Sequence, residues 1–182
     1  TELLSGLYVH GGTGSDNLYL MDGVPLYSVG HLAGVFSSFN SDVIENVDCY
    51  KSGFPARYGG RMSSVVDVTT RDGDFNDYGG TFSIGLIEGR FQMEGPIVKG
   101  KTSFNFGLRR SWLDVLTIPG FALYNALRDS ENSDHTVMRY AMTDLNGKIT
   151  HKFSDDNTLS FSVFAGQDAL KSKSVSDPTD WD

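Results

Sequence analysis

Residues 103–112 read SFNFGLRRSW, and this stretch decides the fold of the second half of the chain. Its apolar and polar side chains alternate, and such a period of two is typical of a β-strand whose two faces meet different surroundings. One face carries Phe104, Phe106, Leu108 and Trp112, and the other carries Ser103, Asn105, Gly107, Arg109 and Ser111. Arg110 departs from the pattern on the apolar side, where a long side chain is tolerated if it reaches a polar boundary such as a membrane surface.

Strands of the same kind flank this one. The apolar phase of residues 82–86 shifts at residues 91–93, so we expect the chain to reverse near Glu88 and Gly89. Turns are predicted at residues 98–101 and 154–157, and two further strands at residues 139–153 and 159–169. A longer excursion, residues 115–138, is predicted as an exposed loop with a short helix at residues 121–128. The second region thus holds about five antiparallel strands.

The predicted strands are long. They cover roughly 9 to 15 residues, whereas a tilted strand needs about 9–11 to cross a bilayer and soluble strands average about five or six. One long loop among short turns also fits a barrel with one short rim. The pattern alone leaves two alternatives open: the wall of a transmembrane barrel, or a soluble sandwich with one apolar face per strand.

The first region has a different pattern. Short strands are predicted at residues 6–10, 17–21, 46–51 and 62–70, with a helical turn at residues 40–44 that Asn40 or Ser41 caps. A turn at residues 72–74 then ends the region. We therefore expect an α+β, mostly β chain, with a small mixed sheet in residues 1–75 and antiparallel hairpins in residues 76–182.

Composition excludes several classes of protein. The chain of 182 residues has a net charge of −8, so no broad basic surface is available to bind nucleic acid. Its single cysteine rules out an internal disulfide framework. The chain starts abruptly in a strand-like pattern and ends in a polar stretch, so we expect it to be a piece of a larger protein.

Signatures of enzymes and of metal sites are missing from the sequence. No G-x-S-x-G elbow accompanies the HGG at residues 10–12, and the four histidines form no HExxH pattern. Residues 11–17 lack the Gly-Lys-Ser/Thr of a phosphate loop, and residues 155–157 are too short for a calcium loop. We predict no catalytic residue, no cofactor and no metal.

Two segments of the first region resemble the plug domain of TonB-dependent outer-membrane receptors. The first comprises VHGG at residues 9–12 and NLYLMDGVP at residues 17–25. The second comprises NSDVIENV at residues 40–47 and YKSGFPARYGGRMSSVVDV at residues 50–68, which is similar to the Bacteroidetes type of receptor. His10 stands where the family usually has Arg, and Ser52 where Gly is common. The hairpins after residue 78 look like the opening of the family's barrel, so the resemblance reaches roughly Leu170.

The resemblance implies a function for the intact protein. It would bind and import a nutrient, such as a glycan, peptide or metal chelate, across the outer membrane of a Gram-negative cell. A TonB-type energy-coupling protein would act through a segment upstream of Thr1, and a surface substrate-binding lipoprotein is a further implied partner. The alternative is a soluble, secreted β-rich binding or adhesion module without transport.

The resemblance also suggests roles for individual residues. Positions that match the outward plug loops give Thr13, Ser15, Asp16, Tyr27 and His31 as ligand contacts. Arg109 would face the barrel lumen and meet plug carboxylates such as Glu45. Phe104, Phe106, Leu108 and Trp112 would face lipid, with Trp112 in an interfacial girdle. In a truncated chain, we expect this apolar stripe to pack against the plug region or to drive self-association.

Overall fold

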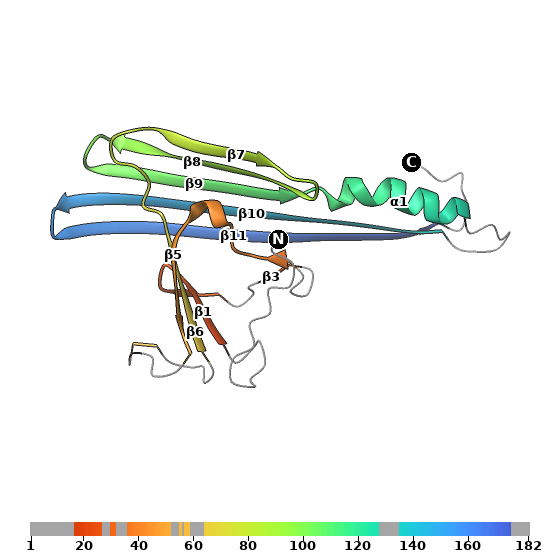
Figure 1. Ribbon diagram of the computed structural model, residues 1–182, viewed down its shortest axis with the longest axis horizontal. Helices are drawn as coiled ribbons and strands as arrows, with labels where there is room; N and C mark the ends of the chain where they lie inside the picture. The colour runs from red at the N-terminus through yellow and green to blue at the C-terminus, as the bar shows by residue number, and fades with distance from the viewer. Residues whose placement is uncertain are drawn as a thin grey trace.

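The computed structural model describes residues 17–26, 30–31, 36–51, 55, 57–58, 64–127 and 135–175. Figure 1 shows a small sheet lying beside one face of a much longer sheet, with the only described α-helix at one end of the long sheet. We call the small sheet the N-terminal sheet and the long one the wall sheet. The mixed small sheet, the short helices and the antiparallel strands confirm the predicted fold class.

The N-terminal sheet has the strand order β2-β1-β6-β5. β1 and β6 are parallel, and the other two pairs are antiparallel. Asp22 and Gly23 connect β1 to β2 with φ angles of 49° and 80°, as the central residues of a type I′ turn require. The strands are β1 (Asn17–Met21), β2 (Val24–Pro25), β5 (Ile44–Tyr50) and β6 (Ser64–Thr70).

Both faces of the N-terminal sheet are apolar. Successive residues of β6 point to opposite sides, so Val66 and Val68 pack with Tyr19 on one face and Val65 packs with Leu20 on the other. A small hairpin of β3 (Gly30–His31) and β4 (Phe36–Ser37) and the 3₁₀-helix η2 (Ser41–Val43) complete this part. Asn40 caps η2, as predicted, because its side chain accepts a hydrogen bond from the amide of Asp42 at 3.2 Å.

The wall sheet is an antiparallel meander of five strands in the order β11-β10-β9-β8-β7. This confirms the predicted strand count of the second region. β10 and β11 have 20 and 19 residues, and both are longer than predicted. The bounds are β7 (Gly79–Ile84), β8 (Glu88–Val98), β9 (Thr102–Ser111), β10 (His135–Ser154) and β11 (Asn157–Val175).

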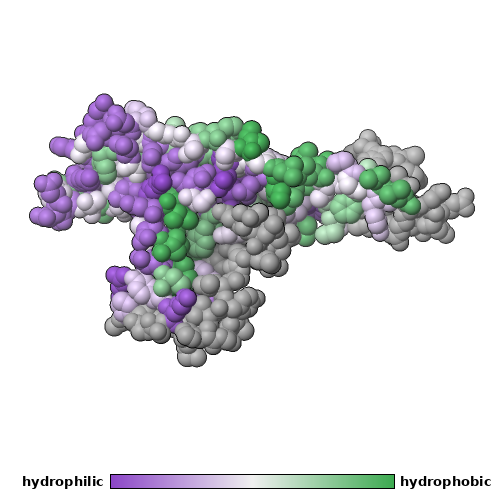
Figure 2. Space-filling view, in the orientation of Figure 1, coloured by the Kyte–Doolittle hydropathy of each residue, from purple (hydrophilic) through white to green (hydrophobic). Residues whose placement is uncertain are grey.

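The two faces of the wall sheet have opposite character. On β9 and β10 the polar residues that face the N-terminal sheet are buried, and Ser103, Ser111, Asp144 and Thr150 are each 0% exposed. Phe82, Ile149 and Phe161 lie on the other face and are 69%, 46% and 70% exposed. Figure 2 shows hydrophilic residues gathered at the end with the short turns and apolar residues toward the helix. The face of the wall sheet toward the N-terminal sheet, here called its inner face, is thus polar, and the opposite, outer face is apolar.

Three predictions about the wall sheet were wrong in detail. The reversal expected at Glu88 lies at residues 85–87, where the amide of Gly85 donates to the carbonyl of Glu88 at 2.8 Å. The helix expected at residues 121–128 is α1 (Leu113–Leu127), which begins directly after β9 and includes Pro119. The apolar stripe was expected to pack against the N-terminal region or to drive self-association. The first of these does not occur, because the polar face of β9, which carries the ion pairs described below, contacts that region instead.

Candidate functional site

The contact between the two sheets is built from ionic side chains. The first group, here called the His31 cluster, joins the β3–β4 hairpin to the wall. His31 places Nε2 2.7 Å from the Asp144 carboxylate and Nδ1 2.6 Å from that of Asp168. Tyr140 donates its hydroxyl to the same Asp168 oxygen at 2.7 Å. The two ring nitrogens of His31 thus bridge the carboxylates of Asp144 and Asp168.

Arg109 completes the His31 cluster. It is 1% exposed and lies directly opposite Asp144 in the β9–β10 register, with its Nη2 2.8 Å and its Nε 3.0 Å from one Asp144 oxygen. The guanidinium also donates to the backbone carbonyls of Ser37 and Phe39 beside the N-terminal sheet. Asp144 therefore receives hydrogen bonds from both parts of the molecule. His31 and Arg109 thus both hold the Asp144 carboxylate, and His31 links it to Asp168.

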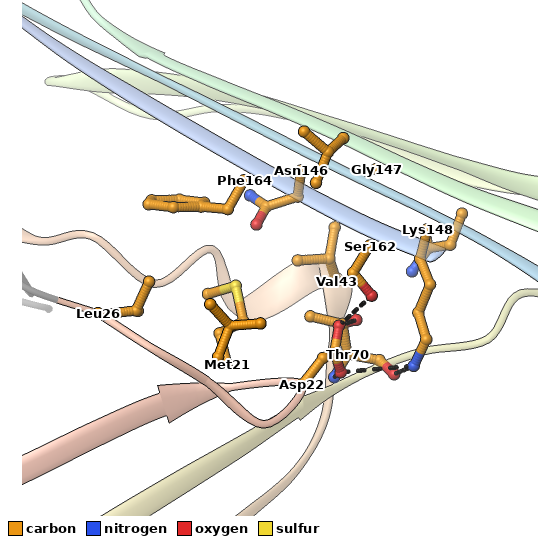
Figure 3. Close-up of a pocket in the computed structure, with 13 residues that line it drawn as sticks. Met21, Asp22, Leu26, Val43, Thr70, Asn146, Gly147, Lys148, Ser162 and Phe164 are labelled. Carbon is orange, nitrogen blue, oxygen red and sulfur yellow. Dashed lines mark hydrogen bonds and ion pairs between the residues drawn. The ribbon is translucent and has the colours of Figure 1, made fainter. Parts of the chain in front are cut away.

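A second group, the Lys148 cluster, lies nearer the short turns. Lys148 places Nζ 2.8 Å from Asp72, 3.4 Å from Asp22 and 2.8 Å from the carbonyl of Thr70. The Asp22 carboxylate also accepts hydrogen bonds from the amide and hydroxyl of Thr70 and from the hydroxyl of Ser162. Figure 3 shows Asp22, Thr70, Lys148 and Ser162 converging between the sheets.

The Lys148 cluster changes the acidity of Asp22. Burial alone would raise the pKa of this carboxyl, because it disfavours the charged form. Hydrogen bonds from Thr70 and Ser162 and the charge of Lys148 act in the opposite direction and outweigh burial. The pKa of Asp22 is therefore lower than its ordinary value, and the carboxylate is ionised in the docked state at neutral pH.

Gly107 allows the two parts to approach closely. A Cβ atom at this position of β9 would lie 2.3 Å from Cγ1 of Val43 in η2, which is closer than real side chains come. Val43 is 1% exposed, and Arg90 of β8 holds the same turn through the hydroxyl of Ser41 at 2.7 Å. At Gly107, η2 therefore packs directly against the backbone of β9, with no side chain between them.

This contact suits two bodies that dock and separate. Its charged groups regain water when the sheets part, which offsets part of the Coulomb energy that is lost. A dry apolar contact would have no such compensation. Within the described ranges, no group of three or more potential metal ligands occurs.

The structure places the predicted site residues as follows. His31 is buried against Asp144 and Asp168. Arg109 faces the N-terminal region, and its carboxylate partners among the described residues are Asp144 and, at 4.0 Å, Glu88. Glu45 is exposed on β5 and is not one of them. Phe104, Phe106, Leu108 and Trp112 lie on the outer face or at its edge. Thr13, Ser15, Asp16 and Tyr27, and the strand predicted at residues 6–10, lie outside the described residues.

Sequence reasoning missed four residues that hold the contact: Asp22, Asp144, Lys148 and Asp168. A signal existed on β10, where Asp144, Asn146, Lys148 and Thr150 follow one another at every second position. This spacing assigns them to one polar face. Their partners on the other sheet are far apart in sequence, and no local pattern identifies them.

Comparisons with known proteins agree with this arrangement. Residues 2–66 match the family described as the TonB-dependent Receptor Plug Domain. The fold is similar to the crystal structure of the siderophore receptor PirA from Acinetobacter baumannii, with a TM-score of 0.55 and 17% identity over 87% of this chain. The similar region covers 24% of that receptor's chain. A comparison with curated protein sequences gives no significant match.

The plug match also gives the location of the protein. Plug domains of this family belong to outer-membrane receptors, which places the chain in the Gram-negative outer membrane. No helix among the described residues has the length and apolar composition needed to cross a membrane.

Proposed function

We propose that this chain is part of a TonB-dependent outer-membrane receptor of the Bacteroidetes type that binds and imports a nutrient. Residues 1–75 form the later part of the plug, and residues 76–182 form the first strands of the barrel. In this assignment the N-terminal sheet is the plug and the wall sheet is a segment of the barrel. The protein is a receptor and not an enzyme.

One observation carries the proposal. The wall sheet buries its polar face against the N-terminal sheet and exposes its apolar face, as shown by Asp144 at 0% and Phe161 at 70% exposure. A soluble sandwich does the reverse, since its apolar faces make the core. A barrel wall that meets lipid outside and a plug inside has this polarity. The strand lengths of 19 and 20 residues also exceed what a soluble sheet needs.

The proposal extends to partners and ligands. A TonB-type protein of the inner membrane supplies energy through a plug segment upstream of Thr1, and a surface lipoprotein delivers the substrate. The nutrient is a glycan, a peptide or a metal chelate. Thr13, Ser15, Asp16 and Tyr27 remain the proposed ligand contacts. His31 is instead proposed as a plug anchor, since both of its ring nitrogens bind the wall.

The experiment is a growth test in the native organism. A strain without the gene is compared with its parent on single glycans, on peptides and on chelated iron as the limiting nutrient. We expect slower growth on one class, with the same defect in a strain that lacks the TonB-type protein. Equal growth of the deletion strain and its parent on all three classes would contradict import as the function.

A further inference from the structure

A cavity of about 160 Å³ lies between the plug and the wall. Met21, Leu26 and Val43 line it from the plug, and Asn146 and Phe164 line it from β10 and β11. Figure 3 shows Asn146 extending from its strand toward the plug, beside Phe164. Asp22, Lys148 and Ser162 close one end, where they already bind one another. The lining of the cavity is therefore mostly apolar, and it includes one polar side chain that has no hydrogen-bond partner.

That polar group is the side-chain amide of Asn146. The residue is 4% exposed, and neither its oxygen nor its nitrogen has a hydrogen-bond partner. Asn105 lines the same cavity and is 3% exposed, yet it accepts a bond from Gln92 and donates to the carbonyl of Arg71. Asn40 lacks a partner only for its nitrogen, since its oxygen accepts from the amide of Asp42. Among the described residues, Asn146 is thus the buried amide that has no partner for either atom, and this needs a cause.

The free atoms of Asn146 define the chemistry of a partner. A carboxamide offers an acceptor and a donor side by side, and it pairs best with a group that presents the complementary pair, as asparagine does with the edge of adenine. The volume corresponds to about five water molecules in the liquid. Met21, Leu26, Val43 and Phe164 suit a compact apolar body. We propose that this cavity binds a small, neutral amide or lactam, held by two hydrogen bonds to Asn146.

A neighbouring cavity provides an approach to this site. It has a volume of about 300 Å³, is lined by His31 and Asp168, and shares Leu26 and Phe164 with the first cavity. An occupant of the Asn146 site touches plug and wall together, so it binds the docked state and stabilises it by mass action. The site depends on the contact between the two sheets, and the binding test below does not require that the protein imports a nutrient.

The test is a binding titration of the purified full-length protein in detergent. The probe is 2-pyrrolidinone, a lactam, followed by saturation-transfer difference NMR. We expect saturable binding that Asn146→Leu weakens about tenfold or more, because two hydrogen bonds are lost while the branching and the number of side-chain heavy atoms are kept. Asn46→Leu is the matched control, since Asn46 is exposed on β5, and it should bind like the parent.

Two results would overturn the assignment: no saturable binding to the parent protein, or equal binding to the parent and to Asn146→Leu. Asn146→Leu should fold, because it replaces an unsatisfied amide with an apolar group of similar size. If it does not, Leu26→Phe narrows the cavity from the plug side and leaves the amide intact. This second variant should also lose the probe, and retention would overturn the proposal.

Discussion

Asp144 is the residue whose loss should most weaken the docking of the N-terminal sheet on the wall sheet. It is 0% exposed and binds Arg109, which is 1% exposed, and His31, which is 5% exposed. Asp144→Ala leaves the guanidinium buried without its carboxylate. Removing one partner of a buried ion pair costs about 3–5 kcal/mol. The cost falls on the docked state, because undocking hydrates Arg109.

The cost corresponds to about a 100-fold to 4,000-fold increase in the undocked population, since each 1.4 kcal/mol is tenfold. Hydrogen exchange measured by mass spectrometry on the full-length protein reports such local opening. The informative amides lie in η2 and in residue 71, whose amide binds the Val43 carbonyl at 2.8 Å. We expect these amides to exchange faster in proportion to opening.

Asp155→Ala is the control for this experiment. Asp155 belongs to the same hairpin as Asp144 but is exposed in the turn between β10 and β11. Its removal should leave exchange unchanged. If Asp144→Ala exchanged no faster in η2 than Asp155→Ala, the His31 cluster would not hold the plug on the wall, and the reasoning would fail.

Three further predictions concern the same interface and the outer face. Gly107→Ala should destabilise docking by about 1–3 kcal/mol, because its methyl overlaps Val43, and Val43→Ala in the same protein should restore normal exchange in η2. Because the pKa of Asp22 is lowered in the docked state, the stability that this carboxylate adds to docking is complete above pH 3.8 and is lost as the pH falls through the lower docked pKa. Asp22→Asn should therefore make the hydrogen-exchange rate of the η2 amides less dependent on pH in this acidic range. An unchanged pH dependence would contradict this role of Asp22. Phe161→Lys should lower the yield of folded protein in membranes at a cost of about 2–4 kcal/mol if the residue lies near the bilayer midplane, whereas Ser160→Lys, which faces inward, should fold into membranes in higher yield.

The faces of the wall sheet could be predicted from sequence because a strand has a strict period of two. The alternation of apolar and polar residues at 103–111 correctly predicted which side chains lie on each face of β9. The turn predicted at residues 98–101 is also present. β10 and β11 were predicted too short because polar residues near their ends, such as His135 and Lys171, resemble a loop. Cross-strand pairing supports them as strands, and that pairing is not visible in a local window.

The helix and the ionic contacts show why the remaining features were missed. Pro119 argues against a helix interior, yet α1 continues through it and makes contacts with β10. Asp144 lies opposite Arg109 only in a register set across the long α1 connection. The bond between His31 and Asp168 joins residues 137 positions apart. Such pairs depend on how the sheets dock, which the sequence pattern of neither sheet specifies.

The proposed receptor requires that the outer face of the wall sheet meets lipid while its inner face meets the N-terminal sheet. Spin labels placed one at a time at residues 159–165 of β11, in full-length protein with Cys49 replaced by Ser and reconstituted in bilayers, test this directly by EPR accessibility. We predict that the accessibility of the labels alternates with a period of two residues. Labels at 159, 161 and 163 should be accessible to oxygen and not to a water-soluble nickel chelate, while labels at 160, 162 and 164 should be shielded from oxygen. Equal exposure of labels at 161 and 163 to the nickel chelate, or no alternation along the strand, would contradict it.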